Sequence, residues 1–279
     1  MVWQMQAGGH INSGSRKRVL ERVQVNMPFG MIAEPYWQDL VLSTPINPEI
    51  GLDAGVLDSC RKTDFAAVAE KLHQRGCSIT IHGPFLDLSP GSPDKAIRNT
   101  SLQRFRQMVE AVEVFRPLVV VCHAAYDASR YDFCREQWIE NSMDTWQWVA
   151  TAVKERGAKL MLENVYERDP SELLAVLERF APELLGCCID VGHQAVFGNV
   201  DLSKWIDRLR SYIGQLHLHD NNGDFDAHLG MGKGCIDFRP VFDFLASCRP
   251  YPLLTLEPHR QEDFDASIAY LEQHLPISS

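Results

Sequence analysis

The sequence lacks the features that would place it in several common classes of protein. No apolar run approaches the ~20 residues needed to cross a membrane. The first residues, MVWQMQAGGHINSGSRKRV, include basic side chains but no apolar segment of the kind found in secretory signals. Neither a GxGxxG nor a GxxxxGKS/T phosphate-binding loop is present. We therefore expect a cytoplasmic protein with no membrane partner.

Paired cysteines and an excess of positive charge are also missing. The 8 cysteines form no CxxC pair, and several lie in apolar runs such as Val119–Cys122 and Cys187–Ile189. They are typical of buried free thiols in a reducing compartment. The net charge of -10 offers no general attraction to the phosphates of a nucleic acid. A nucleic-acid partner is therefore disfavoured. Only a local basic groove would allow nucleic-acid binding in spite of the net charge.

Short apolar runs alternate with amphipathic stretches along the whole chain. The runs predict strands at Val23–Met27, Glu49–Leu52, Ser78–Ile81, Leu118–Cys122, Lys159–Leu162, Gly186–Ile189, Ile213–Leu218 and Leu253–Leu256. Apolar residues recur at every third or fourth position between them and predict helices at Thr63–Arg75, Ser101–Phe115, Glu136–Arg156, Ser171–Phe180 and Arg239–Ser247. Alternating strands and helices imply a parallel sheet with right-handed crossovers. Eight such units predict an α/β protein of the closed (β/α)8 TIM-barrel type.

The chain shows no sign of a division into domains. It contains no internal repeat, low-complexity segment or Pro/Gly-rich linker, so we expect one barrel over residues 21–279. Residues 1–20 are expected to form a disordered or loosely attached extension, in which His10 has no role. His73 and His274 fall within helical patterns and are expected to be exposed.

Carboxylates and imidazoles follow the predicted strands where each strand ends. They are His82, His123, Glu163, Asp190, His193, His217, Asp226, His228 and Glu257. The carboxyl ends of the strands meet on one rim of a TIM barrel, so we expect these side chains to share its mouth. So many buried imidazoles and carboxylates are costly unless cations neutralise them. A mixed His, Asp and Glu set suits Zn²⁺, Mn²⁺, Fe²⁺ or Co²⁺ better than Mg²⁺ or Ca²⁺, and therefore predicts a divalent metal site. The competing interpretation is that a strand-end Asp such as Asp190 only caps the following helix.

The chain resembles the xylose isomerase-like TIM barrel superfamily. The resemblance is carried, in order, by IHGPFLDLSPGSPDKAIRNTSLQRF, VVVCHAAYD, MLENVYE, CIDVGHQ, HLHDNNGDFDAHLGMGKGCIDF and LTLEPH, over residues 78 to 260. This superfamily includes sugar isomerases and epimerases as well as endonuclease IV, the family 2 apurinic (AP) endonuclease. Each motif is weak alone, and the ordered set is specific.

The resemblance implies a role for each of these positions. A metal shared by all branches would be held by Glu163, Asp190, His217 and Glu257. In the isomerase and epimerase branch, Glu163 and Glu257 also transfer protons as the catalytic pair, and His193 contacts the sugar. In the endonuclease branch the same four residues are joined by His82, His123, His193, Asp226 and His228, and together they hold three zinc ions. The resemblance thus implies one to three ions per chain, Zn²⁺ or Mn²⁺.

Two further histidines are candidates for the site. His219 lies two residues from His217 and so faces the same side of the strand. It is the alternative ligand from this strand, and His217 is preferred because it stands three residues before Asp220, like the metal-binding histidine in both branches. His259 follows Glu257 closely and is a candidate substrate contact.

Two enzymatic functions remain open. Isomerisation or epimerisation needs a metal that polarises adjacent oxygens and a base that removes a carbon-bound proton. Phosphodiester hydrolysis gains from several metals, and a DNA enzyme also needs phosphate contacts and wedging side chains. Phe85 and Leu86 could form a wedge, but Lys95 and Arg98 are the only basic residues in their loop. We therefore expect a sugar, cyclitol or sugar-phosphate substrate, with a zinc phosphodiesterase or AP endonuclease as the alternative. A metal-binding barrel without catalysis is disfavoured by the two candidate catalytic glutamates.

Overall fold

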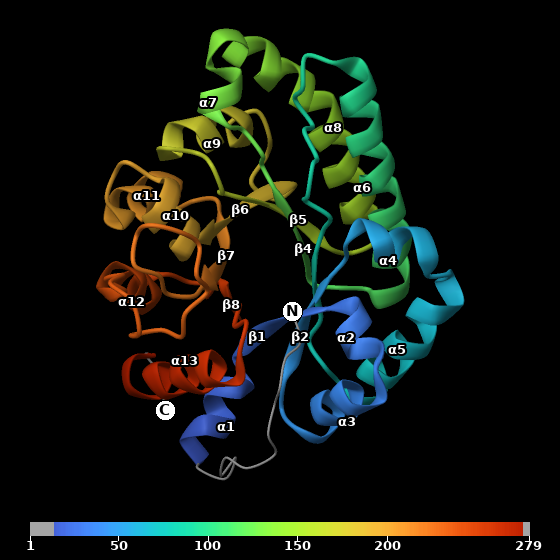
Figure 1. Ribbon diagram of the computed structural model, residues 1–279, viewed down its shortest axis with the longest axis vertical. Coiled ribbons are helices and arrows are strands. Elements are labelled where there is room, and N and C mark those ends of the chain that lie inside the picture. The colour runs from blue at the N-terminus through green and yellow to red at the C-terminus, as the bar shows by residue number, and fades with distance from the viewer. Residues whose placement is uncertain (1–13, 276–279) are drawn as a thin grey trace.

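Eight parallel strands close into a barrel in the computed structural model, which describes residues 14–275 (Figure 1). They are β1 (Val23–Pro28), β2 (Asn47–Gly51), β3 (Thr80–His82), β4 (Val119–His123), β5 (Lys159–Glu163), β6 (Leu185–Asp190), β7 (Ile213–Leu218) and β8 (Leu253–Leu256). Each strand pairs with the next, and β8 pairs with β1. The predicted (β/α)8 barrel is therefore confirmed, with every strand near its predicted position.

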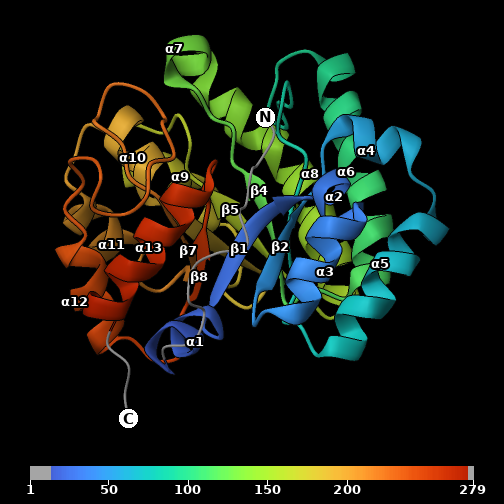
Figure 2. The same cartoon turned by 60° about the horizontal axis from the view of Figure 1, so that its bottom comes forward.

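Helices surround the strands on the outside of the barrel (Figure 2). They are α1 (Gly14–Leu20), α2 (Phe29–Ala33), α3 (Pro35–Ser43), α4 (Ala54–Ser59), α5 (Lys62–Arg75), α6 (Lys95–Phe115), α7 (Ala128–Tyr131), α8 (Arg135–Glu155), α9 (Pro170–Leu177), α10 (Val191–Phe197), α11 (Leu202–Leu209), α12 (Arg239–Ser247) and α13 (Gln261–His274), with a 3-10 turn at Asp132–Cys134. Helix α6 begins six residues earlier than predicted, because the side chain of Asp94 accepts a hydrogen bond from the backbone N–H of Ala96. His73 and His274 are exposed, as expected.

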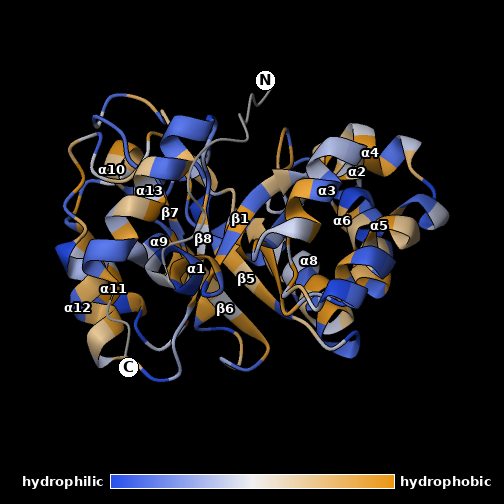
Figure 3. Ribbon diagram, turned by 90° about the horizontal axis from the view of Figure 1, so that it is seen from below, coloured by the Kyte–Doolittle hydropathy of each residue, from blue (hydrophilic) through white to orange (hydrophobic). Residues whose placement is uncertain are grey.

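The two faces of each strand are buried in different surroundings. Side chains on one face, such as Ile50, Val120 and Leu216, pack against the helices in the main hydrophobic core. Figure 3 shows this concentration of hydrophobic residues on the strands. The opposite face fills the barrel, with a small apolar cluster of Val119, Val121, Met161 and Cys188. The side chains of Gln24, Glu49, Thr80, Gln215 and Thr255 are also buried in the strands. Side chains alternate between the two faces of a strand. Polar side chains on the inner face can therefore continue from the barrel interior to its mouth.

Helix α1 lies within the segment expected to be a loose extension. The helix packs on α13 (Figures 1 and 2). Val19 and Leu20 are buried, and Arg16 forms an ion pair with Asp265. The boundary expected at residue 20 is thus corrected, because these contacts join residues 14–20 to the barrel. Residues 1–13, and His10 among them, lie outside the described residues.

The remaining features expected from the composition can be compared directly with the structure. All 8 cysteines are free, and Cys122, Cys187 and Cys188 are buried. Cys235 is exposed, so the expectation of buried thiols does not hold for every one. No helix within residues 14–275 is both long and apolar enough to span a membrane.

Candidate metal centre

The strand ends carry their polar side chains into one shared site. His82, His123 and Glu163 are the last residues of β3, β4 and β5, and Asp190 is the last residue of β6. The nine predicted residues lie within a network of imidazole–carboxylate distances of 2.9–3.8 Å. Together with His219, they form five overlapping sets whose donor atoms are close enough to hold a cation, and these sets gather into three neighbouring groups.

The first group consists of His82, His123 and Glu163. Oε2 of Glu163 lies 3.1 Å from Nε2 of His82 and 3.6 Å from Nε2 of His123. The other ring nitrogen of His82 lies 2.9 Å from the carbonyl oxygen of Gly83, which fixes the orientation of the ring. One carboxylate oxygen therefore faces two imidazole nitrogens, an arrangement that suits a cation between them.

The second group joins Glu163, Asp190, His217 and Glu257. Nδ1 of His217 lies 3.4 Å from Oε1 of Glu163, 3.1 Å from Oε1 of Glu257 and 3.8 Å from Oδ2 of Asp190. Oε1 of Glu163 and Nδ1 of His217 are buried and have no hydrogen-bond partner. Buried polar atoms of this kind require a partner, so the donor set fits a divalent cation, with Glu163 shared with the first group.

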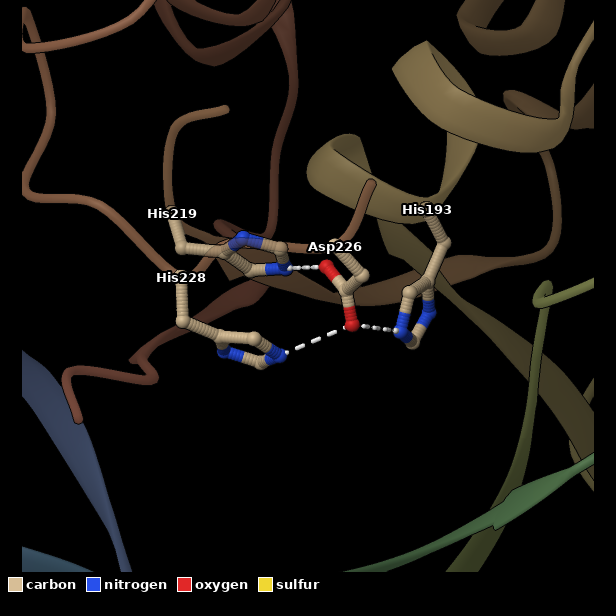
Figure 4. Close-up of side chains that lie close together, drawn as sticks. All are labelled: His193, His219, Asp226 and His228. Carbon is tan, nitrogen blue, oxygen red and sulfur yellow. Dashed lines mark hydrogen bonds and ion pairs between the residues drawn. The ribbon is translucent and has the colours of Figure 1, made fainter. Parts of the chain in front are cut away.

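The third group contains His193, His219, Asp226 and His228 (Figure 4). Oδ2 of Asp226 lies 2.9 Å from Nε2 of His228 and 3.3 Å from Nε2 of His193. The Nδ1 atoms of His193 and His228 lie 3.0 Å from the carbonyl oxygens of Asn164 and Glu257 respectively. These backbone contacts direct both Nε2 atoms towards Asp226.

His217 and His219 are not alternatives, because both side chains point into the site. His217 lies among Glu163, Asp190 and Glu257, as preferred from the sequence. Nε2 of His219 lies 3.1 and 3.2 Å from the two carboxylate oxygens of Asp190 and 3.7 Å from Oδ1 of Asp226. His219 therefore lies between the third group and Asp190 of the second.

Asp190 has a structural role in addition to its place in the site. Its Oδ1 accepts a hydrogen bond from the backbone N–H of His193 at 2.6 Å and so caps α10. The side chain of Asn164 bonds to both the N–H and the carbonyl oxygen of Asp190, each at 3.0 Å. The helix cap expected under the competing interpretation is therefore present, and it fixes the orientation of the carboxylate.

Glu49 on β2 is a member of the site that the sequence did not reveal. It is fully buried, and its Oε1 lies 3.1 Å from Nε2 of His217. Thr80 Oγ1 donates to Oε2 at 3.0 Å, and Asn26 Nδ2 donates to Oε1 at 3.2 Å. A carboxylate on the far nitrogen of a metal-binding histidine fixes its tautomer and orientation. Glu49 lies two residues before the end of its strand, so a search restricted to strand ends does not find it.

The buried charges of the site shift one another's pKa values. Burial alone would raise the pKa of Glu163, but His217 and His123 outweigh it and hold that pKa well below its usual range. Burial alone would lower the pKa of His228, but Asp226 and Glu257 more than offset it and raise that pKa to about 9. Burial dominates at His123 and lowers its pKa to about 3. Glu163 is therefore ionised, and a proton on His228 balances part of the negative charge of the site.

A cavity of about 700 Å³ opens above these groups. Met31, Trp37, Leu52 and Phe85 form an apolar part of its wall, and the histidines and carboxylates form another part. His259 also lines it, and its ring stacks on His228 with centroids 4.1 Å apart, so it is placed to contact a bound molecule. Among the described residues of the lining there is no Lys or Arg. The cavity has the size of a small-molecule site.

Comparisons with known proteins agree with this architecture. A family model described as "Xylose isomerase-like TIM barrel" matches residues 49–274. The uncharacterized proteins MJ1311 and MJ1614 of Methanocaldococcus jannaschii are each 27% identical, over 71% and 70% of this chain and 70% and 77% of their own lengths.

Solved structures are similar over most of the chain. A D-tagatose 3-epimerase-like protein superposes with a TM-score of 0.76 at 21% identity, covering 90% of this chain and 97% of that one. The TTHB071 protein from Thermus thermophilus, studied after soaking with ZnCl2, has a TM-score of 0.71 at 26% identity with the same coverage. D-psicose 3-epimerase from Clostridium cellulolyticum H10 has a TM-score of 0.68 at 15% identity, covering 88% and 90%.

Proposed function

Because the chain belongs to the xylose isomerase-like TIM barrel family, we propose that it is a divalent-metal-dependent enzyme that isomerises or epimerises a sugar or cyclitol without a phosphate group. The substrate occupies the 700 Å³ cavity at the mouth of the barrel. The similarity to structures described as sugar 3-epimerases supports this choice of reaction.

The observation that carries the proposal is the placement of two glutamates around one point. Glu163 on β5 and Glu257 after β8 approach the same atom, Nδ1 of His217, at 3.4 and 3.1 Å. Histidines hold the pKa of each carboxyl low against the effect of burial, so both are ionised and able to accept a proton. Epimerisation requires removal of a carbon-bound proton and its return, and two carboxylates that flank the substrate can perform these steps.

Glu163, Asp190, His217 and Glu257 would hold the cation nearest to the reacting carbon. A bound divalent cation supplies polarisation of adjacent substrate oxygens, which acidifies the carbon-bound proton. Glu49 keeps Nδ1 of His217 directed at this position. His193 and His259 line the cavity and are placed to orient substrate hydroxyl groups.

The cavity lining favours a substrate without phosphate. Recognition of a phosphate group ordinarily uses Arg or Lys, and the described lining residues include neither. Glu34 and Asp53 add carboxylates to this lining instead. The apolar side chains of Trp37 and Phe85 can pack on the C–H face of a sugar ring. These features support a neutral polyhydroxyl compound.

Exchange of a carbon-bound proton with solvent tests this function. The metal-loaded enzyme is incubated with a panel of free ketoses and cyclitols in deuterated water, and incorporation is followed by NMR. We expect deuterium at one carbon, and Glu257→Gln to slow incorporation by about 10²–10⁴-fold. Glu70→Gln, an exposed glutamate on α5, is the matched control and retains the wild-type rate. Absence of exchange across the panel, with phosphodiester hydrolysis present, would overturn the proposal.

The three groups of donors favour a second candidate, a multinuclear zinc phosphodiesterase of the AP endonuclease kind. Several cations assist phosphodiester hydrolysis by activating water and stabilising the leaving oxygen. Phe85 and Leu86 are 50% and 77% exposed on the loop after β3 and could contact a nucleic acid. The acidic net charge opposes DNA binding. Metal-dependent nicking of an abasic oligonucleotide that is lost in Glu257→Gln would establish this function instead.

A further inference from the structure

We propose that His219 is a positioning residue of the metal centre. It donates a hydrogen bond to Asp190 and turns that carboxylate towards His217, without binding a cation itself. The proposal rests on the metal dependence proposed above and holds for either of the two reactions. It separates His219 from the histidines that face the cation positions.

Several histidines of the site have one ring nitrogen anchored on an acceptor, which leaves the other nitrogen for a cation. The anchored atoms are Nδ1 of His82, His193 and His228, each 2.9–3.0 Å from a backbone carbonyl oxygen, and Nε2 of His217, 3.1 Å from Oε1 of Glu49. A metal-binding histidine ordinarily donates its second N–H to such an acceptor. When a cation binds, the ring proton of each of these histidines therefore stays on the anchored nitrogen.

His219 has no such anchor. Its side chain is 1% exposed, its Nδ1 is buried without a hydrogen-bond partner, and its ring lies against Gly192, which has no polar side chain to offer. A cation on Nε2 would require the ring proton on Nδ1, as a buried donor with no acceptor. A proton on Nε2 is donated to the carboxylate of Asp190 instead. The surroundings of the ring therefore favour a hydrogen-bond donor over a metal ligand.

Stacking also separates the role of His219 from that of His228. The two rings lie one above the other, with centroids 4.0 Å apart and planes 9° apart (Figure 4). Each nitrogen lone pair lies in the plane of its own ring, so two rings stacked in this way cannot both direct a lone pair at one ion. Nε2 of His228 lies 2.9 Å from Asp226, whereas Nε2 of His219 lies 3.7 Å from it and closer to Asp190. His228 is therefore the ligand of this pair.

Two donors fix the carboxylate of Asp190. The backbone N–H of His193 donates to Oδ1 at 2.6 Å, and Nε2 of His219 lies 3.1 Å from Oδ1 and 3.2 Å from Oδ2. Oδ2 is also the oxygen that faces Nδ1 of His217, at 3.8 Å. Because the helix cap occupies Oδ1, Oδ2 is the oxygen left for the cation. His219 keeps the carboxylate in the plane that presents Oδ2 to this position.

Zinc affinity in two variants of His219 tests the proposal without measuring activity. The side-chain amide in His219→Gln can still donate to Asp190, whereas the side chain in His219→Leu cannot. Competition between Zn²⁺ and a chelator measures the affinity for the ion that His217→Leu removes. We expect this affinity to fall about 10–100-fold in His219→Leu and to stay close to the wild-type value in His219→Gln. His274→Leu, at an exposed position, is the control and should leave the affinity unchanged.

The position of the ring proton gives a second, independent readout. Nitrogen NMR of the zinc-loaded protein, with its histidines labelled with ¹⁵N, distinguishes a ring protonated on Nε2 from one protonated on Nδ1. We expect the proton of His219 on Nε2 and that of His228 on Nδ1. The signals that disappear in His219→Gln and in His228→Gln identify the two rings.

A different pattern would overturn the assignment. If His219 is itself a ligand, both of its variants should weaken zinc binding equally, and its ring proton should lie on Nδ1. An unchanged affinity in His219→Leu would show that His219 does not position Asp190. Circular dichroism establishes that each variant is folded, and His219→Met replaces His219→Leu if the latter is not. Wild-type protein that binds no divalent cation would refute the proposed function as well, whereas zinc binding without sugar exchange would refute only the proposed reaction.

Discussion

The imidazole of His219 occupies the space in which a side chain at Gly192 would lie. An ideal Cβ on Gly192 would be 1.9 Å from Cε1 of His219, far inside any permitted contact. The side chain of Asn221 donates a hydrogen bond to the carbonyl oxygen of Gly192 at 2.9 Å and joins the same two segments. The glycine of the DVGH motif and the second histidine of HLHD therefore depend on each other.

Gly192→Ala is expected to destabilise the fold and displace His219. Overpacking in a filled interior costs about 1–3 kcal/mol, because neither the helix nor the buried ring can move freely. Urea unfolding measures this loss. Gly30→Ala is the matched control, since a Cβ there would meet nothing within 4 Å. Equal stability of the two variants would contradict the close contact.

Glu49→Gln is expected to weaken the metal bound by His217. The glutamine keeps the shape of the side chain but removes the charge that orients the imidazole, and loss of such a partner costs about 10–100-fold in metal affinity. Competition with a chelator measures the dissociation constant. Glu70→Gln, exposed on α5, removes the same charge elsewhere and should leave the affinity unchanged. An unaltered affinity in Glu49→Gln would show that β2 has no part in the centre.

Metal affinity should keep rising with pH above 7. In the metal-free protein, carboxylates raise the pKa of His193 well above the usual value against the effect of burial, and that of His228 to about 9. Cys188 and the carboxylates of Glu257, Glu49 and Glu163 likewise raise the pKa of His217. These imidazoles hold protons that a cation must displace. Chelator competition between pH 6 and 9.5 tests this, and an affinity that levels off near the ordinary histidine pKa of about 6.5 would disagree.

The same shifts predict how the metal-free protein responds to pH. The pKa of these imidazoles is higher in the folded protein than in the unfolded chain, so their protonated forms stabilise the fold below about pH 6.5. This contribution is lost as the pH rises through about 9, the pKa of His228. Stabilisation by added Zn²⁺ should therefore be greatest at alkaline pH. Thermal unfolding with and without Zn²⁺ at pH 6 and 9 measures the difference. A metal-induced shift that is larger at pH 6 would contradict the assignment.

Glu167 should make stability fall between about pH 4.5 and 7. This carboxyl is buried and accepts the backbone N–H groups of Val165 at 2.7 Å and Tyr126 at 3.0 Å. Burial raises its pKa to about 7 in spite of these hydrogen bonds. A raised folded pKa favours the protonated form, so ionising the group costs stability, roughly 3 kcal/mol once pH exceeds 7. Urea unfolding at pH 5 and 8 should show a smaller difference in Glu167→Gln than in the wild type or in Glu178→Gln, an exposed control.

Local patterns in the sequence were sufficient to predict the barrel and most of the side chains that meet at its mouth. Strand and helix periods are read from neighbouring residues, and a parallel barrel brings all strand ends to one rim. The polar residues at the predicted strand ends therefore include His82, Glu163 and Asp190. The α1 segment was missed because Val19 and Leu20 are buried by α13, which lies at the other end of the sequence.

By itself the sequence determined which side chains reach the mouth of the barrel, because all the parallel strands run in one direction and end at the same rim. Only the tertiary structure decided which of these side chains lie next to one another. It placed Glu49 on the far nitrogen of His217, and it placed His219 beside Asp226 instead of making it a substitute for His217. These pairings depend on the register between strands and on the space left by Gly192, and both arise from contacts between residues distant in sequence.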